Sequence, residues 1–119
     1  GVTRHPLLWA LALWAGSHVA PNGDLAHVLL FGALGAFALL GTVALDRRVR
    51  ARVGNEEWNR LAARTSLVPL AAILDGRHPP AAWHRPAPVR LAAAGLAFLL
   101  LVALHPVAIG VSPLPPVLP

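Results

Sequence analysis

The stretch Leu25–Leu45 constrains this chain more than any other, because it runs for 21 residues without a formally charged side chain. As an α-helix, at about 1.5 Å per residue, it is long enough to cross the roughly 30 Å hydrocarbon layer of a bilayer. Its apolar residues do not keep to one face, which excludes an amphipathic surface helix. A chain of 119 residues also has too little mass to bury such a helix in a soluble domain. We therefore expect Leu25–Leu45 to span a membrane.

The composition agrees with this expectation, since 56% of the residues are hydrophobic, 13% are charged and the formal net charge is +5. A basic balance can indicate nucleic-acid binding, but arginines beside long apolar runs more often set membrane topology. We therefore expect the lipid bilayer as a partner and no nucleic acid. The absence of cysteine excludes disulfides, thiol nucleophiles and cysteine-ligated metals. The opening residues, GVTRHP, are typical of an internal stretch, so we expect a longer parent protein.

Two further apolar stretches predict membrane spans. Pro6–Ala20 is short for a full crossing, so its helix is expected to be tilted or to begin before the first residue. Leu91–Gly110 is long enough, and Pro106 removes one backbone hydrogen bond near its far end. The short turn Pro21–Asp24 between the first two spans predicts an antiparallel hairpin.

Side chains in and after this turn predict how the hairpin is built. Either Asn22 or Asp24 is expected to cap the second helix. Three small residues of the second span predict a face that another helix can approach closely: Gly32, Gly35 and Ala36.

The segment after the second span is expected to lie on the membrane. Asp46–Arg64 has apolar residues at helical spacing among arginines, with Gly54 dividing it into two helical pieces. Glu56 and Arg60, four residues apart, are expected to form an ion pair. Ser66–Leu74 is apolar but too short to span, which predicts a re-entrant or interfacial piece.

The arginines predict the orientation of the chain. Arg4 and the nine arginines of residues 47–90 belong on the cytoplasmic side, which leaves Pro21–Ala26 and the tail Ser112–Pro119 outside. Gly76–Pro88, with four prolines, is expected to be an irregular loop. The predicted fold is a single-domain, all-α integral membrane protein of residues 1–119, with an interfacial or re-entrant helical segment and three transmembrane helices at about residues 6–20, 25–45 and 91–110.

Three of the six histidines are candidate ligands, because His18, His27 and His105 all map to the outer half of the membrane. Ionisable groups at membrane depth are costly, which favours a role as haem or metal ligands or proton carriers. The alternative is that each is a neutral imidazole hydrogen-bonded to a neighbouring helix. Trp14 lies four residues before His18 and therefore shares a helix face with it.

A second candidate site lies at the inner edge of the first span. Arg4 and His5 precede Pro6 at a helix start, where they could bind a carboxylate or a phosphate. The alternative is a simple interface anchor. Glu56 and Glu57 are possible partners, although pairing with Arg60 is the expected use of these acidic side chains.

Motifs along nearly the whole chain resemble the NnrU family of membrane proteins, namely Val2–Trp9, Ala12–His18, Asn22–Ala26, Leu30–Gly32, Asp46–Arg48, Thr65–Pro69, Asp75–Arg77, Leu104–Pro106 and Gly110–Pro115. The resemblance implies a role in bacterial nitrite and nitric oxide metabolism. Together with the distribution of arginines, it predicts a multi-pass protein of the bacterial inner membrane with a periplasmic C-terminus. Plant carotenoid isomerases similar to this family are haem b proteins with histidine ligands. Family members usually have a further N-terminal half with more spans.

A more distant resemblance is to isoprenylcysteine and phospholipid methyltransferases, which use an Arg-His-Pro motif around S-adenosylmethionine. Arg4-His5-Pro6 matches that motif. Asp46-Arg47, however, stands where those enzymes have paired glutamates, and Trp58 stands near their tyrosine. These departures argue against methyl transfer as the main activity.

Three functional hypotheses follow from the sequence. The first is a haem b membrane protein in nitrogen-oxide metabolism or a carotenoid-isomerase-like reaction, with His18 and then His105 as iron ligands. The second is an accessory transmembrane subunit that packs against other membrane subunits or the missing N-terminal half. The third is a membrane methyltransferase. The candidate cofactor-binding residues are His18, His105, His27, Arg4 and His5.

Overall fold

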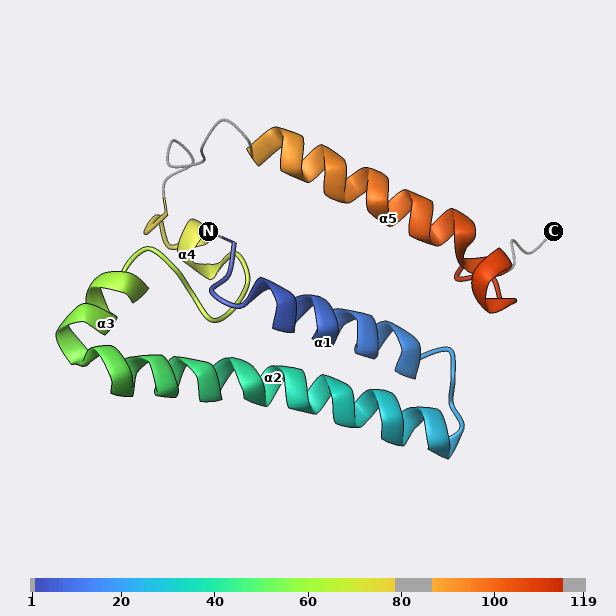
Figure 1. The fold of residues 1–119 in the computed structure, drawn as a ribbon, viewed down its shortest axis with the longest axis horizontal. Coiled ribbons are helices and arrows are strands. Elements are labelled where there is room, and N and C mark those ends of the chain that lie inside the picture. The colour runs from blue at the N-terminus through green and yellow to red at the C-terminus, as the bar shows by residue number, and fades with distance from the viewer. Residues whose placement is uncertain (1, 79–86, 115–119) are drawn as a thin grey trace. The chain divides into compact units, whose positions relative to one another are not determined.

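The computed structural model describes residues 2–78 and 87–114, in which every regular element is a helix (Figure 1). The chain divides into two compact units, residues 1–82 and 83–119, which we describe separately. The first unit contains α1 (Pro6–Val19), α2 (Leu25–Val53), α3 (Asn55–Ala62) and α4 (Ala71–Leu74), and the second contains α5 (Ala87–Ile109). The all-α prediction is therefore confirmed for the described residues.

α1 and α2 form the predicted antiparallel hairpin, and both alternatives for the cap have a role in it (Figure 1). Pro6 occupies the first turn of α1, where its missing N–H costs nothing. Asp24 is the N-cap of α2, since its carboxylate accepts a hydrogen bond of 3.2 Å from the backbone N–H of His27. Asn22 instead interacts with the end of α1, because its side-chain amide donates a hydrogen bond of 2.9 Å to the backbone carbonyl of His18. The turn therefore satisfies backbone groups of both helices.

Small side chains bring the two helices together. Ala15 of α1 and Ala38 of α2 are fully buried. A Cβ atom on Gly35 would lie 3.7 Å from the Cβ of Ala15, which is ordinary van der Waals contact. Thr42, one turn beyond Ala38, is also buried. The contact face of α2 is therefore the row of residues 35, 38 and 42, at helical spacing.

Of the three small residues predicted to offer a face for close approach, Gly35 lies on the contact row with α1, whereas Gly32 and Ala36 do not. Ala36 is exposed, because it lies one residue past Gly35 and so points about 100° away from the contact row. A Cβ atom on Gly32 would have nothing within 4 Å. At that level the helices are joined by aromatic rings, since Phe31 contacts Trp14 at a centroid distance of 5.3 Å.

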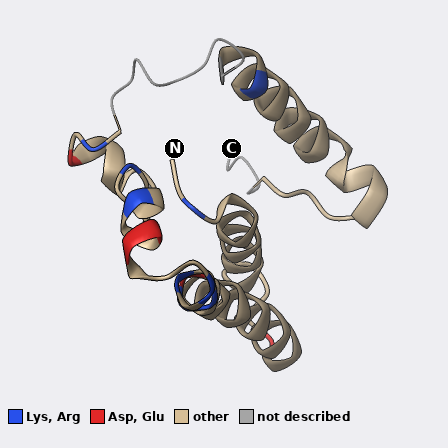
Figure 2. Ribbon diagram, turned by 60° about the vertical axis from the view of Figure 1, so that its left-hand side comes forward, with Lys and Arg blue, Asp and Glu red and all other residues tan. Residues whose placement is uncertain are grey.

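α2 continues well beyond the predicted end of the span at Leu45. It runs for 29 residues to Val53, through all four arginines of residues 47–52 (Figure 2). Arginine is a good helix former, so the change from apolar to basic residues does not interrupt the helix. The helix ends at Gly54, whose φ of 83° suits glycine, and α3 begins at the next residue. The predicted break at Gly54 is confirmed, whereas the separate surface helix expected from Asp46 is wrong.

The segment after α3 is mostly irregular. The predicted Glu56–Arg60 pair is wrong, because Arg60 instead pairs with Glu57, three residues before it, at 2.6 Å. Only Ala71–Leu74 of the expected interfacial piece is helical. The buried Ser66 hydroxyl accepts a hydrogen bond from the backbone N–H of Ala72, at 3.0 Å, and so connects the irregular part to α4. Most of the predicted proline-rich loop, residues 79–86, lies outside the described residues.

α5 corresponds to the third predicted span and begins four residues earlier than expected, at Ala87. Pro106 lies inside the helix, as predicted, and the helix ends at Gly110, whose φ is 85°. The backbone N–H of Gly110 donates 2.9 Å to the carbonyl of Pro106. Of the predicted extended tail, residues 115–119 lie outside the described part of the chain.

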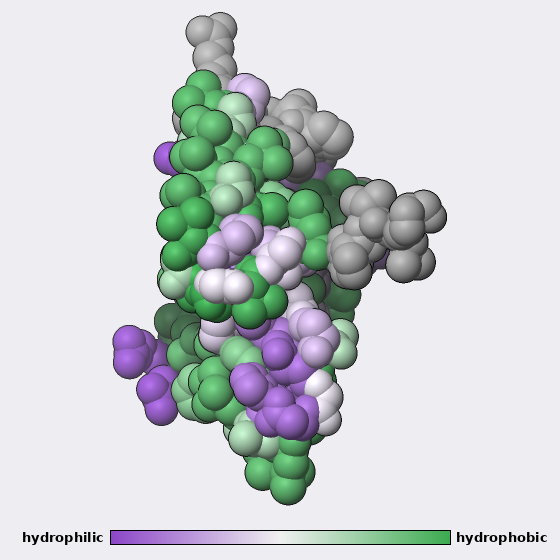
Figure 3. Space-filling view, turned by 90° about the vertical axis from the view of Figure 1, so that its right-hand side faces the viewer, coloured by the Kyte–Doolittle hydropathy of each residue, from purple (hydrophilic) through white to green (hydrophobic). Residues whose placement is uncertain are grey.

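Within residues 2–78 and 87–114, two helices are long and apolar enough, by length and composition, to cross a membrane: Leu25–Val53 and Pro88–Ile109. Their large apolar side chains are exposed rather than packed inside, as in the view of Figure 3. Examples are Phe37, Leu40, Leu101 and Val107. The first predicted span, as α1, is an apolar helix of 14 residues. The prediction of three spans therefore stays a prediction, while two helices of suitable length are present.

The buried contact between α1 and α2 generates a stability prediction. Replacing the buried Ala38 by leucine overfills the interface, so we expect Ala38→Leu to lower the free energy of unfolding by about 1–3 kcal/mol. The control is Gly32→Ala, whose added Cβ meets open space and should stay within about 1 kcal/mol of the wild type. Thermal unfolding followed by circular dichroism in one detergent compares them. Equal midpoints for the two variants would refute this packing.

Candidate functional site

The first candidate site lies where α1 turns into α2 and consists of Trp14, His18, His27 and Phe31, here called the aromatic–histidine cluster. Phe31 of α2 is its centre, with ring centroids 5.3 Å from Trp14, 4.9 Å from His18 and 6.0 Å from His27. Trp14 and His18 contact each other at 4.8 Å, which confirms that they share a face of α1. Two candidate histidines are therefore brought to the same aromatic ring.

The hydrogen bonds of His18 determine which ring nitrogen can act as a ligand. Its Nδ1 lies 2.7 Å from the backbone carbonyl oxygen of Trp14. A carbonyl oxygen only accepts hydrogen bonds, so Nδ1 carries the proton of the neutral ring. The lone pair then belongs to Nε2, for which no hydrogen bond within the described residues is present. This arrangement, Nδ1–H to a backbone carbonyl with Nε2 unengaged, is typical of metal-ligating histidines.

His27 is engaged differently. Its Nδ1 is hydrogen-bonded to the carboxylate of Asp24, and both side chains are about half exposed. The hydrogen bond from the backbone N–H of His27, followed by that from its side chain, lowers the pKa of Asp24 below its usual value. The carboxylate therefore stays ionised and holds the imidazole near the cap of α2.

His105 belongs to the second unit and repeats the geometry of His18. Its Nδ1 lies 2.7 Å from the carbonyl oxygen of Val111, beyond the end of α5. Because this carbonyl accepts the Nδ1 proton, Nε2 again carries the lone pair. His105 thus has the ligand-competent tautomer, although it does not share a unit with His18.

The second candidate site, here called the Arg4–Asp46 cluster, lies at the other end of the hairpin. The guanidinium of Arg4 donates to Asp46 through Nη2 at 2.8 Å and through Nε at 3.2 Å. His5 Nε2 donates to Oδ1 of the same carboxylate at 2.7 Å. All three side chains are between 14% and 20% exposed, so the ion pair is largely shielded from solvent. The Asp46 carboxylate is therefore shared by Arg4 and His5.

The irregular segment after α3 completes this cluster. Arg4 Nη1 donates 3.2 Å to the carbonyl of Thr65, and its backbone N–H donates 3.0 Å to the carbonyl of Ser66. Trp9 Nε1 donates 2.9 Å to the carbonyl of Leu67. The guanidinium carbon of Arg4 also lies 5.3 Å from the centroid of the Trp58 ring, in a cation–π arrangement. Arg4 thus joins α1, α2, α3 and residues 65–66.

The partner of both Arg4 and His5 in this cluster is Asp46. On sequence alone, Glu56 and Glu57 are the possible partners, and Asp46 is not paired with Arg4 or His5. The signal that was available is topological: in an antiparallel hairpin the start of α1 and the end of the apolar part of α2 lie at the same end. A lone carboxylate at residue 46 is thereby a partner for Arg4. Phe31 was likewise missed, although it lies four residues after His27.

Because the Arg4–Asp46 ion pair is shielded from solvent, we expect the loss of Asp46 to lower the free energy of unfolding more than the loss of a more exposed aspartate. Asp46→Asn removes the charge that Arg4 and His5 share, and we expect the free energy of unfolding to fall by about 1.5–3 kcal/mol. The matched control is Asp75→Asn, which removes a more exposed pair with Arg77 and should cost at most about 1 kcal/mol. Thermal unfolding in detergent measures both. Equal losses would mean that the Arg4–Asp46 pair is energetically an ordinary surface contact.

A family model and two curated relatives match this chain. The family model that matches is described as NnrU protein and covers residues 1–113. The 15-cis-zeta-carotene isomerase of Arabidopsis thaliana is 37% identical over 83 residues, covering 64% of this chain and 20% of the relative. The enzyme of the same name from Zea mays is 37% identical over 76 residues, with the same coverage.

The chain thus spans about a fifth of the length of these curated relatives, both described as chloroplastic. No solved structure matches it. Because the family model extends over nearly the whole sequence, from the Arg4–Asp46 cluster through the aromatic–histidine cluster to α5, this chain belongs to the NnrU family.

Proposed function

We propose that this chain is part of a haem b membrane protein with a carotenoid-isomerase-like reaction, in which His18 ligates the iron through Nε2. The observation that carries the proposal is the hydrogen bond from His18 Nδ1 to the carbonyl of Trp14, which leaves the Nε2 lone pair unengaged beside two aromatic rings. The printed names of the relatives support the reaction class.

The donor groups of the chain fit haem better than a free metal ion. The described residues contain no group of three or more His, Cys, Asp or Glu that could hold a metal ion. A haem iron has four ligands from its porphyrin and needs only one or two from the protein. A porphyrin is also a large apolar plate, which suits the exposed rings of Trp14 and the partly exposed Phe31.

The remaining candidate residues take other roles in this proposal. His105 is the second candidate for the iron, because its Nε2 is likewise left with the lone pair. His27 is third, because its side chain is about half exposed near the cap of α2, where water can reach it. Arg4 and His5 lie at the opposite end of α1, a helix of 14 residues or about 20 Å, so they cannot share an iron with His18. Their engagement with Asp46 makes them positioning residues that hold the hairpin closed.

The chemistry fits an apolar substrate. When bound, haem b supplies an iron that changes its oxidation state, while the protein residues bind, orient and exclude water. A carotene is a long hydrocarbon that dissolves in the bilayer, and the exposed apolar faces of α2 and α5 would meet it there. We further propose that α1, α2 and α5 are three spans of a bacterial inner-membrane protein with a periplasmic C-terminus.

The same haem site is compatible with a role in nitrogen-oxide metabolism, the alternative reaction class implied by the family resemblance. An accessory subunit is the second candidate function, favoured by the apolar side chains that α2 and α5 leave exposed for packing against other membrane subunits. Methyl transfer is disfavoured, because Asp46 engages both Arg4 and His5, which would have to contact S-adenosylmethionine.

The proposed topology predicts which side of the membrane each loop faces. Because the arginine excess lies in residues 47–90, we expect this segment inside and the turn at residues 21–24 outside. Cysteine introduced in place of Asn22 should react with a membrane-impermeant maleimide added to intact cells, and cysteine in place of Asn55 should react only after lysis. The reverse pattern would overturn the orientation.

The proposed ligand predicts a spectral change. Protein purified after haem-replete expression should show a Soret band, and His18→Ala should lose most of it because Nε2 is removed. His105→Ala should shift the band if the second unit supplies the other ligand. The absorption spectrum and haem content per protein are the measurements.

Two variants control this experiment. His5→Ala removes an imidazole at the other end of α1 and should leave the band in place. His27→Ala removes an imidazole that lies beside Phe31 and is bonded to Asp24, and this variant should also retain the Soret band. Absence of the band in the wild type would refute haem binding and favour the accessory subunit.

A further inference from the structure

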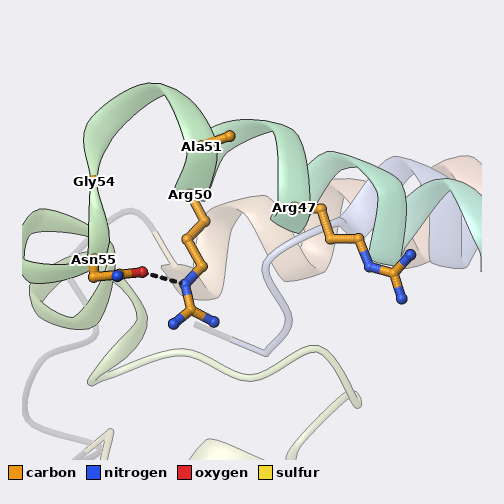
Figure 4. A pocket seen from close by; sticks show the side chains of 5 residues that line it. All are labelled: Arg47, Arg50, Ala51, Gly54 and Asn55. Carbon is orange, nitrogen blue, oxygen red and sulfur yellow. Dashed lines mark hydrogen bonds between the residues drawn. The ribbon is translucent and has the colours of Figure 1, made fainter.

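A shallow pocket of about 420 Å³ lies where α2 ends, lined by Arg47, Arg50, Ala51, Gly54 and Asn55 (Figure 4). Residues 47, 50, 51 and 54 have the i, i+3, i+4, i+7 spacing of one helix face. The chain turns at Gly54, with a φ of 83°, which brings Asn55 of α3 to the same place. The pocket is thus built by the break between the two helices.

The pocket carries two positive charges without a carboxylate to neutralise them. In the described part of the chain the ion pairs of arginine involve Arg4, Arg60 and Arg77, and neither Arg47 nor Arg50 takes part in one. Arg50 Nε donates 2.7 Å to the side-chain oxygen of Asn55, which orients the guanidinium and leaves its two terminal nitrogens available (Figure 4). Both arginines are exposed.

The position along α2 indicates what these charges meet. The apolar stretch ends at Leu45, so Arg47 and Arg50 lie about 3 Å and about 7.5 Å further along the helix axis. The headgroup layer of each leaflet begins at the edge of the hydrocarbon and is about 5–8 Å thick. If α2 crosses the membrane, as the proposed function holds, the two guanidinium groups lie at the depth of the lipid phosphates.

We propose that this pocket binds the phosphate group of an anionic lipid headgroup. The planar guanidinium presents paired N–H donors that match phosphate oxygens, and both Arg47 and Arg50 line this pocket from one helix face (Figure 4). The C-terminus of α2 and the N-terminus of α3 meet at Gly54, so the partial negative charge of one helix end offsets the partial positive charge of the other, and the arginines determine the charge of the pocket. The inference rests on the membrane placement of α2 and is independent of haem.

Native mass spectrometry of the full chain in a neutral detergent tests the proposal by titration with dioleoylphosphatidylglycerol. We expect Arg47→Gln/Arg50→Gln to raise the dissociation constant of the first bound lipid at least about tenfold. The matched control, Arg48→Gln/Arg52→Gln, removes the same charge from residues that do not line the pocket and should change it less than about threefold. Asn55→Ala keeps every arginine and should weaken binding severalfold by releasing Arg50.

The outcomes separate a defined site from general attraction. Equal weakening by the two double variants would overturn the proposal, because the arginine block would then act only by its total charge. Displacement of the lipid by 10 mM inorganic phosphate, on the order of its concentration in cells, would show a site for the free ion instead. Retained lipid selectivity without a Soret band would leave this proposal standing while the haem proposal fails, so the two are distinguishable.

Discussion

Asp46 closes the hairpin, because one carboxylate accepts hydrogen bonds from both Arg4 and His5. These residues precede α1 in the chain, whereas Asp46 lies far along α2, so the contact joins segments about forty residues apart. The backbone of the same N-terminal segment bonds to residues 66 and 70, which brings the irregular segment after α3 against the helices. Without this carboxylate, a shielded guanidinium and an imidazole would lose their acceptor, which is costly where solvent access is low.

The contacts in the Arg4–Asp46 cluster position the residues at the opposite end of the hairpin. With α1 and α2 held together by Arg4–Asp46 and by the close approach of Ala15 to Gly35, the aromatic–histidine cluster forms at the turn. There Phe31 touches Trp14 and both histidines, and the carbonyl of Trp14 sets the tautomer of His18. At one end of the hairpin the Asp46 carboxylate is therefore hydrogen-bonded to Arg4 and His5. At the other end, Nε2 of His18 has no hydrogen-bond partner among the described residues. This division of roles underlies the proposed haem site.

Much of the fold could be predicted from local rules, and the misses have physical causes. The cap at Asp24, the break at Gly54 and the shared face of Trp14 and His18 follow from residue type and helical spacing. The end of α2 was misplaced because a change in charge marks the edge of a membrane, not the end of a helix. The contact row and the partner of Arg4 were missed because both depend on residues of another helix, which spacing within one helix does not reveal.

The central claim, that His18 is an iron ligand through Nε2, is tested most directly by chemical rescue. His18→Gly leaves a space that free imidazole can enter, so protein purified without imidazole should lack the Soret band and regain it when imidazole is added with haemin. The rescue is specific, because it replaces the ligand and nothing else. A His18→Gly protein with wild-type haem content and spectrum in the absence of imidazole would contradict the account.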